Sequence, residues 1–151
     1  MNRFNFRLNP LLMLREMQET ETARALREAL ASQQKLEVAL SAAQSLSETA
    51  RVNLDKTEGW KTGAADFVAA LADFDRKLAA ERSAGEDLRK QAERVAAARR
   101  VWQQAVTELK TVAKLREKAA QLHRKEEARR EQLQLDEVGA HFSGTSVSTQ
   151  L

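Results

Sequence analysis

Glu58-Gly59-Trp60-Lys61-Thr62-Gly63 decides the fold of this chain, because it places two glycines close together in an otherwise uninterrupted sequence. Outside this stretch, residues 11–138 contain no proline and no glycine except Gly85. Glycine and proline are the poorest helix formers. The stretch therefore predicts a turn between two long helices, one over about residues 10–57 and the other over about residues 64–137.

Helices of this length are typical of coiled coils and not of globular domains. At the α-helical rise they would be about 70 Å and about 110 Å long. The composition agrees, since 31% of the residues are charged, 5% are aromatic, and alanine supplies much of the 42% hydrophobic fraction. There is too little bulky apolar surface for a globular core. The expected fold class is all-α: two long helices in an antiparallel coiled-coil hairpin.

Apolar residues recur every three or four positions in both helices, as coiled-coil packing requires. The stripe expected in the first helix breaks its spacing once, after Leu30, and consists of Ala23, Leu26, Leu30, Leu36, Leu40, Ala43, Leu46, Ala50 and Leu54. The stripe expected in the second helix is Phe67, Leu71, Phe74, Leu78, Glu81, Gly85, Leu88, Ala92, Val95, Arg99, Trp102, Val106 and Leu109. It continues through Val112 to Leu115, which predicts a local phase slip called a stammer.

Folding the chain at the paired glycines sets the expected register. It places Leu26 opposite Val95, and the start of the first helix opposite about Val112. The last part of the second helix, about 25 residues at the length set above, then projects beyond its partner. An alternative stays open, because Ser83-Ala84-Gly85-Glu86 matches a capping box and could mark a second turn.

The two ends of the chain differ from the helical middle. Phe4, Phe6 and Leu8 alternate with polar residues, which predicts an extended segment before Asn9-Pro10 opens the first helix. Residues 138–151 are rich in glycine, serine and threonine and predict a flexible tail. We therefore expect one coiled-coil domain over residues 1–137 and a tail over residues 138–151.

The charge pattern and the missing motifs exclude several classes of function. Residues 94–125 contain only two carboxylates, Glu108 and Glu117, among many lysines and arginines. This pattern indicates a solvated basic face or a surface for an acidic partner. No catalytic or phosphate-binding motif occurs, so we expect no enzyme and no cofactor. His123 and Glu127 share a helix face, but two ligands do not make a metal site, and none is expected. No apolar run is long enough to span a membrane, so a cytoplasmic location is expected.

Both ends of the chain resemble one family. The stretch Arg3-Phe4-Asn5-Phe6-Arg7-Leu8-Asn9-Pro10-Leu11-Leu12-Met13-Leu14-Arg15-Glu16 is similar to the start of FliJ proteins, the small coiled-coil proteins of flagellar type III export. The stretch Glu126-Glu127-Ala128-Arg129-Arg130-Glu131-Gln132-Leu133-Gln134-Leu135-Asp136-Glu137 resembles the charged end of that family. The helical middle is generic coiled coil and adds little.

The resemblance implies an antiparallel coiled coil similar to the stalk (gamma) subunit of rotary F-type ATPases. It implies a central stalk that binds the flagellar export ATPase hexamer and promotes its assembly. It also implies contacts with the cytoplasmic domain of the export gate and with export chaperones, and a peripheral association with the inner membrane at the flagellar base. The residues expected to bind the ATPase are Arg7, Leu11, Leu12, Arg15, Glu16, Asp136 and Glu137.

Contacts with the gate or with chaperones would use the other half of the hairpin, at Ala43, Leu46, Ala50, Phe67 and Phe74. The first helix lacks the aromatic residues that family members often carry there. Injectisome stalk proteins share the architecture and remain an alternative. A generic coiled coil that binds an acidic partner or nucleic acid is another, although nucleic acid is not expected. Which end of the hairpin meets which partner, and in what stoichiometry, stays open.

Overall fold

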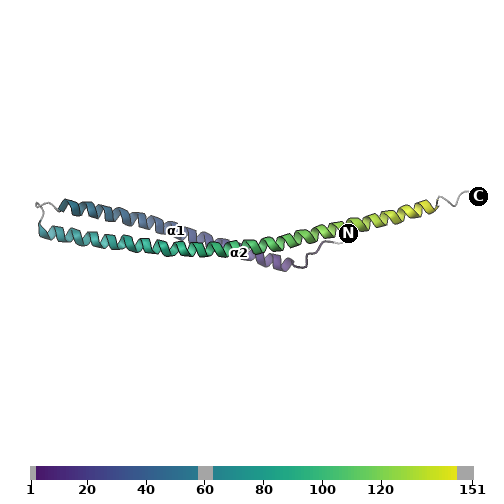
Figure 1. Ribbon diagram of the computed structural model, residues 1–151, viewed down its shortest axis with the longest axis horizontal. Coiled ribbons are helices and arrows are strands. Elements are labelled where there is room, and N and C mark those ends of the chain that lie inside the picture. The colour runs from purple at the N-terminus through teal and green to yellow at the C-terminus, as the bar shows by residue number, and fades with distance from the viewer. Residues whose placement is uncertain (1–2, 58–62, 146–151) are drawn as a thin grey trace, which may run out of the picture. The chain divides into compact units, whose positions relative to one another are not determined.

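The computed structural model describes residues 3–57 and 63–145 and consists of two helices. Helix α1 spans Asn9–Thr57 and helix α2 spans Ala64–Thr145 (Figure 1). They pack against each other as an all-α hairpin, and the described ranges contain no strand, so the expected fold class is confirmed. The expected turn, with Gly59, Trp60 and Thr62, lies outside the described residues.

The starts of both helices follow from local chemistry. The N–H of Leu12 donates to the carbonyl of Leu8 at 3.0 Å, so the first helical hydrogen bond spans Pro10, whose missing N–H costs nothing there. At the start of α2, the N–H groups of Asp66 and Phe67 donate to the carbonyl of Gly63 at 3.1 and 3.3 Å. Gly63 therefore takes the capping role at the start of this helix.

Helix α2 runs through Gly85 without interruption, which excludes the second turn that the capping-box pattern allowed. A Cβ atom built on Gly85 would meet nothing within 4 Å, so no close packing requires glycine there. One glycine in a helix costs only about 1 kcal/mol relative to alanine. The coiled-coil contacts on either side outweigh that cost.

Helix α2 also ends later than expected. It continues past Glu137 to Thr145, into the segment that composition assigned to a flexible tail. Gly139 is tolerated inside it, and no proline follows to end the helix. The Ser143 hydroxyl donates to the carbonyls of Gly139 and Ala140 at 3.1 and 3.0 Å. Composition overstated the tail because a single glycine such as Gly139 costs a helix only about 1 kcal/mol relative to alanine.

The tertiary contacts divide the chain into two units, which we describe separately. The central unit is Glu19–Ala105. The terminal unit combines Met1–Gln18 with Val106–Leu151. Each unit contains part of α1 and part of α2.

In the central unit the inward-facing positions follow a regular spacing of alternating three and four residues, and we call these positions the seam. The buried and half-buried residues of α1 are Glu19, Thr22, Ala23, Leu26, Ala29, Gln33, Leu36, Leu40, Ala43, Ser47, Ala50, Leu54 and Thr57. Those of α2 are Phe67, Ala70, Asp73, Phe74, Lys77, Leu78, Glu81, Ala84, Gly85, Leu88, Gln91, Val95, Ala98, Trp102 and Ala105. The seam is thus made mainly of leucine, alanine and polar side chains.

The expected stripes were wrong at several positions. Leu30 and Leu46 are 37% and 54% exposed, and the break in spacing that they implied does not exist. In α2, Leu71 is 39% exposed, and Ala92 and Arg99 are exposed as well. The residues one position away, such as Ala29 and Gln91, face inward instead. Reading apolar residues alone selects a leucine where the helical geometry uses its alanine or glutamine neighbour.

Polar contacts across the central unit confirm the expected register. The side-chain amide of Gln91 donates to the carbonyl of Ala29 at 3.0 Å, and Trp102 Nε1 donates to Glu19 Oε1 at 3.1 Å. Both contacts agree with the placement of Leu26 opposite Val95. Val95 is 6% exposed, as that placement requires.

In the terminal unit the seam keeps the same spacing, so the expected stammer is wrong. Val112 is 6% exposed and Ala119 is half-buried, whereas Leu115 is 46% exposed. On α1 the seam is represented by Leu12, which is 6% exposed, and by the half-buried Arg15. The phase is therefore continuous, and Leu115 lies outside it.

Candidate functional site

The extended segment before α1 lies against α2. Phe4 and Phe6 are half-buried while Asn5 and Arg7 are exposed, as the alternation predicted, but Leu8 is 40% exposed and does not continue the pattern. The ring of Phe4 meets the ring of His123 edge-on, with centroids 5.4 Å apart and planes at 60°. Edge-on aromatic pairs of this kind contribute about 0.5–1.5 kcal/mol beyond their buried area. The contact fixes the N-terminal segment on α2.

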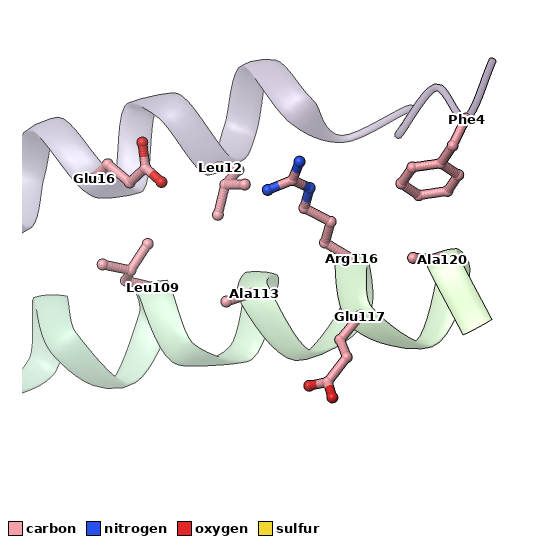
Figure 2. Close-up of a pocket in the computed structure, with 8 residues that line it drawn as sticks. All are labelled: Phe4, Leu12, Glu16, Leu109, Ala113, Arg116, Glu117 and Ala120. Carbon is pink, nitrogen blue, oxygen red and sulfur yellow. The ribbon is translucent and has the colours of Figure 1, made fainter.

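A groove of about 510 Å³ opens between α1, α2 and this segment (Figure 2). Its lining residues are Phe4, Leu12, Glu16, Leu109, Ala113, Arg116, Glu117 and Ala120. In Figure 2 the Arg116 side chain extends toward α1 between Leu12 and Phe4, and Glu117 points away from α1. No described carboxylate lies within ion-pair distance of Arg116. The groove thus combines an apolar floor with a guanidinium that has no ionic partner among these residues.

Arg15 forms an ion pair across the helices next to this groove. Its Nη1 donates to Glu108 Oε2 at 2.6 Å and to Gln18 Oε1 at 3.0 Å. The two charged side chains are 29% and 37% exposed, so the pair is partly shielded from water. Among the described atoms, Arg15 Nε is buried with no hydrogen-bond partner. The pair therefore stabilises the packing of α1 on α2 while leaving one donor unsatisfied.

Breaking the Arg15–Glu108 pair from one side should destabilise the terminal unit. We expect Arg15→Ala to lower the free energy of unfolding by about 1–2 kcal/mol, because Glu108 keeps its charge in a half-shielded position. The swapped pair Arg15→Glu with Glu108→Arg should recover most of the loss. Urea unfolding of the unchanged protein, Arg15→Glu, Glu108→Arg and the swapped pair forms a double-mutant cycle that measures the coupling. A coupling energy of zero would contradict this account.

The residues expected to bind the ATPase do not lie in one place. The structure gathers the N-terminal ones at the start of α1, where Leu12 and Arg15 belong to the seam while Arg7 and Glu16 are exposed. Glu16 is one of the residues that line the groove. Leu11 is half-buried and is not among them.

Asp136 and Glu137 lie apart from that group. They are about 20 Å further along α2 than His123, by the helical rise. Both are exposed, and Gln132 Nε2 donates to Asp136 Oδ1 at 3.0 Å. Every described side chain from Arg124 to Gly144 is exposed except Glu127, which lies 3.7 Å from His123.

The residues expected to meet the gate or chaperones lie in the central unit, and most face inward. Ala50 is 2% exposed, and Ala43, Phe67 and Phe74 are half-buried. Leu46 is 54% exposed and presents most of its side chain to solvent. A partner that binds the closed hairpin can therefore touch Leu46 directly but can reach Ala50 only if the helices separate.

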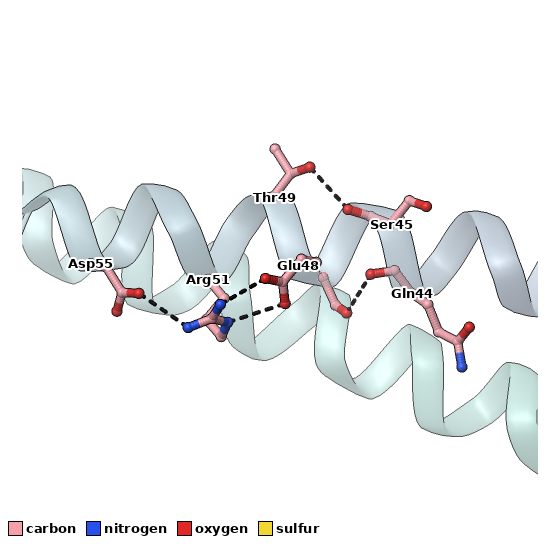
Figure 3. Close-up of polar contacts among 7 residues, drawn as sticks. Gln44, Ser45, Glu48, Thr49, Arg51 and Asp55 are labelled. Carbon is pink, nitrogen blue, oxygen red and sulfur yellow. Dashed lines mark hydrogen bonds and ion pairs between the residues drawn. The ribbon is translucent and has the colours of Figure 1, made fainter.

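An exposed ion-pair network follows Leu46 on α1 (Figure 3). Arg51 binds both oxygens of Glu48, at 2.7 and 3.1 Å, and reaches Asp55 at 3.2 Å. The hydrogen bond from Arg51, and then its charge, hold the pKa of Glu48 below the ordinary value of 4.5. On α2, Arg89 lowers the pKa of Glu86 in the same way. Both carboxylates stay ionised to lower pH than a free glutamate.

These lowered pKa values predict an acid-sensitive contribution to helix stability. Because each folded-state pKa lies below the unfolded value, the contribution is present above about pH 4.5 and is lost as the pH falls through the folded pKa. We expect carbon-13 NMR titration to show the pKa values of Glu48 and Glu86 below the ordinary value of 4.5. Arg51→Gln should return Glu48 to its ordinary range and leave Glu86 unchanged. If Arg51→Gln changed the pKa values of Glu48 and Glu86 by the same amount, this assignment would be contradicted.

The sequence reasoning missed several residues of the terminal site. Glu108 could have been found, because the expected register places it opposite Arg15. The alternation of Phe4 with polar residues predicted an extended segment but not the packing of its ring on His123. Arg116 gave no signal of its own, because it lies in a basic stretch where every cation looks alike.

Two further properties bear on the kind of site this is. The described residues contain no group of three or more metal-ligating side chains, and His123 and Glu127 stand as a pair. Within the same residues, neither helix is apolar over a long enough stretch to cross a membrane.

Comparison with known proteins gives one match. The family model described as flagellar FliJ protein matches residues 4–146, which is nearly the whole chain. Neither the curated proteins nor the solved structures include a match. The matched range covers both described helices and the segment before α1.

Proposed function

The chain belongs to the FliJ family of flagellar proteins, and from this premise we propose that it is the central stalk of the flagellar export ATPase. The family makes it a component related to flagellar protein export. The finer role proposed here is non-enzymatic: the chain binds the ATPase hexamer through its terminal unit and promotes assembly of the ring.

The observation that carries the proposal is the solvated end of α2. Residues 124–144 continue as helix beyond His123, which Phe4 contacts, and nearly all their side chains are exposed. Exposed single helices gain little stability of their own and are suited to docking in a partner. Asp136 and Glu137 lie on this part of α2, and Arg7 and Glu16 supply exposed charges at the start of α1.

The proposal assigns contacts with the export gate and the chaperones to the central unit. Leu46 is the member of the expected set that is accessible in the closed hairpin. The neighbouring Glu48, Arg51 and Asp55 offer charges beside it. These contacts would hold the protein at the inner membrane peripherally, through the export apparatus.

Binding to the purified export ATPase tests the stalk role. We expect the unchanged chain to bind and to shift the ATPase from monomer to hexamer in analytical ultracentrifugation. Asp136→Ala with Glu137→Ala should weaken binding about tenfold, because the double variant loses one or two charged contacts with the ATPase. The matched control is Asp75→Ala with Asp87→Ala, two exposed carboxylates of the central unit, which should leave binding within about twofold. No binding by the unchanged chain would end the proposal.

A further inference from the structure

Helix α2 carries a second regular face in the terminal unit, which we call the outer stripe. Its residues are spaced alternately by four and three positions and are Thr111, Leu115, Lys118, Leu122, Lys125 and Arg129. All six are exposed, with Leu115 at 46% and Leu122 at 66%. The spacing is the one that places residues on a single side of a helix and suits packing against another helix.

The outer stripe faces away from α1. At 3.6 residues per turn its residues fall within an arc about 80° wide, and the centre of that arc lies about 120° from the centre of the seam. The seam itself passes through Val112, Ala119 and His123, which are buried or half-buried. The hairpin therefore leaves this second face uncovered among the described residues.

The two faces together explain the phase slip that the sequence suggested. Leu115 looked like a member of the seam displaced by a stammer, yet the seam is continuous without it. Two heptad patterns overlap in this part of α2, and only one of them is used by the hairpin. An exposed pair of leucines seven residues apart has no role in the packing that the structure describes.

Lys118 and Lys125 of the outer stripe have no acidic partner among the described residues of their own helix. The positions three and four residues from Lys118 and Lys125 hold lysine, arginine, leucine, glutamine and alanine, and none of the described carboxylates is within ion-pair distance of either lysine. Arg24 and Arg51, by contrast, pair with carboxylates on the next turn of α1. Like charges one turn apart, such as Lys114 and Lys118, destabilise a helix slightly.

We propose that the outer stripe is a docking surface for an acidic amphipathic helix of a partner protein. Leu115 and Leu122 would enter the apolar side of that helix, and its carboxylates would pair with Lys118 and Lys125. This is the helix-against-helix mode of recognition, in which apolar anchors set affinity and flanking charges set the choice of partner. The surface goes beyond the proposed stalk role, and its two leucines precede residues 124–144, the segment proposed to dock in the ATPase.

Charge and composition disfavour the other possible occupants. A second copy of this chain would bring its own lysines and Arg129 against these cations in a symmetric contact. A membrane-bound helix carries a broad apolar face with aromatic residues, whereas this stripe has two leucines and no aromatic residue. Single-stranded nucleic acid is held by aromatic stacking, which the stripe cannot provide.

A designed peptide tests the docking surface directly. The probe is a fluorescently labelled helical peptide of three heptads. One face of it carries leucines and glutamates spaced alternately by four and three residues. Its control is a scrambled peptide of the same composition. Anisotropy titrations would use the full-length chain at low and at high ionic strength. We expect the patterned peptide to bind, and binding to weaken at high ionic strength because exposed ion pairs are screened.

Two double variants separate the apolar and the charged parts of the contact. Leu115→Gln with Leu122→Gln, and Lys118→Glu with Lys125→Glu, should each weaken peptide binding at least about tenfold. The matched controls are Val38→Gln with Val68→Gln and Lys35→Glu with Lys56→Glu, which change exposed residues of the central unit and should stay within about twofold. Circular dichroism should show unchanged helix content, since glutamine and glutamate are good helix formers.

Several results would overturn the proposal. One is equal binding of the scrambled and patterned peptides. Another is peptide binding that both stripe variants leave unchanged. A third is tighter binding of phosphatidylglycerol vesicles or of a single-stranded oligonucleotide than of the peptide, and a fourth is a dimer of this chain that the leucine variant abolishes. Binding to the export ATPase, measured in parallel, tests the stalk role independently of these results.

Discussion

Replacing Trp102 with alanine should lower the free energy of unfolding by about 3 kcal/mol. This value is the low end of the range for truncating a buried aromatic side chain to alanine. Trp102 is half-buried on the seam of the central unit, and its Nε1 donates to Glu19 across the hairpin. The change removes both the packing of the indole and this hydrogen bond to a charged group. In a chain of this size we expect the melting temperature to fall by roughly 10 °C. Thermal unfolding followed by circular dichroism measures it.

Two milder variants separate the contributions at this position. Trp102→Phe keeps most of the ring and removes the donor, so it should cost about 1–2 kcal/mol. Glu19→Gln keeps an acceptor oxygen but no charge and should cost less. If Trp102→Phe were as destabilising as Trp102→Ala, packing of the ring would contribute nothing and the account of the seam would be wrong.

Deleting residues 124–151 should abolish binding to the export ATPase while leaving the hairpin intact. The deleted stretch contains the end of α2 with Asp136 and Glu137, and nearly all of its described side chains are exposed. Helix that buries no surface adds little to stability. We expect the melting temperature to fall by no more than about 4 °C, equivalent to about 1 kcal/mol. Binding measured by surface plasmon resonance should fall below detection.

A shorter deletion provides the control for this experiment. Removing residues 146–151 alone spares every described residue of α2 and should leave both binding and stability unchanged. A truncated chain that still bound the ATPase with full affinity would place the binding surface on the remaining part of the terminal unit. A truncated chain that failed to fold would show that the end of α2 packs on the rest of the protein.

The fold could be read from the sequence because few residues of this chain interrupt helices. The glycines at positions 59 and 63 predicted the two helices and their approximate bounds, and folding about them predicted the register that Gln91 and Trp102 confirm. The end of α2 was missed because a single Gly139 does not stop a helix that no proline follows.

The individual seam positions were harder to predict than the fold. Ala29 and Gln91 face inward, although a search for the bulkiest apolar residues selects their neighbours Leu30 and Ala92. The deciding factor is the angle around the helix axis, which depends on the whole repeat and not on one side chain. Sequence alone does not reveal which of two overlapping repeats a partner helix will use.

The candidate site was predictable only in part. Resemblance at the N-terminus pointed to the neighbourhood of Leu12 and Arg15, and the structure shows that both also hold the two helices together. The groove with Arg116 depends on how Phe4 folds back onto α2, which no local pattern specifies. The partner residues in both units remain predictions until binding is measured.

The small side chains of the seam have a consequence for how well this hairpin is aligned. Methyl groups at positions such as Ala29, Ala70 and Ala98 fit almost equally well opposite a neighbour one heptad away, so they define no single alignment. Contacts with one specific partner atom do so, and Gln91 and Trp102 make them. Leucine in place of Gln91 would remove one of these two contacts and would leave the hairpin freer to slide between alternative alignments. The polar side chains of the seam thus fix which residues of the two helices lie opposite each other.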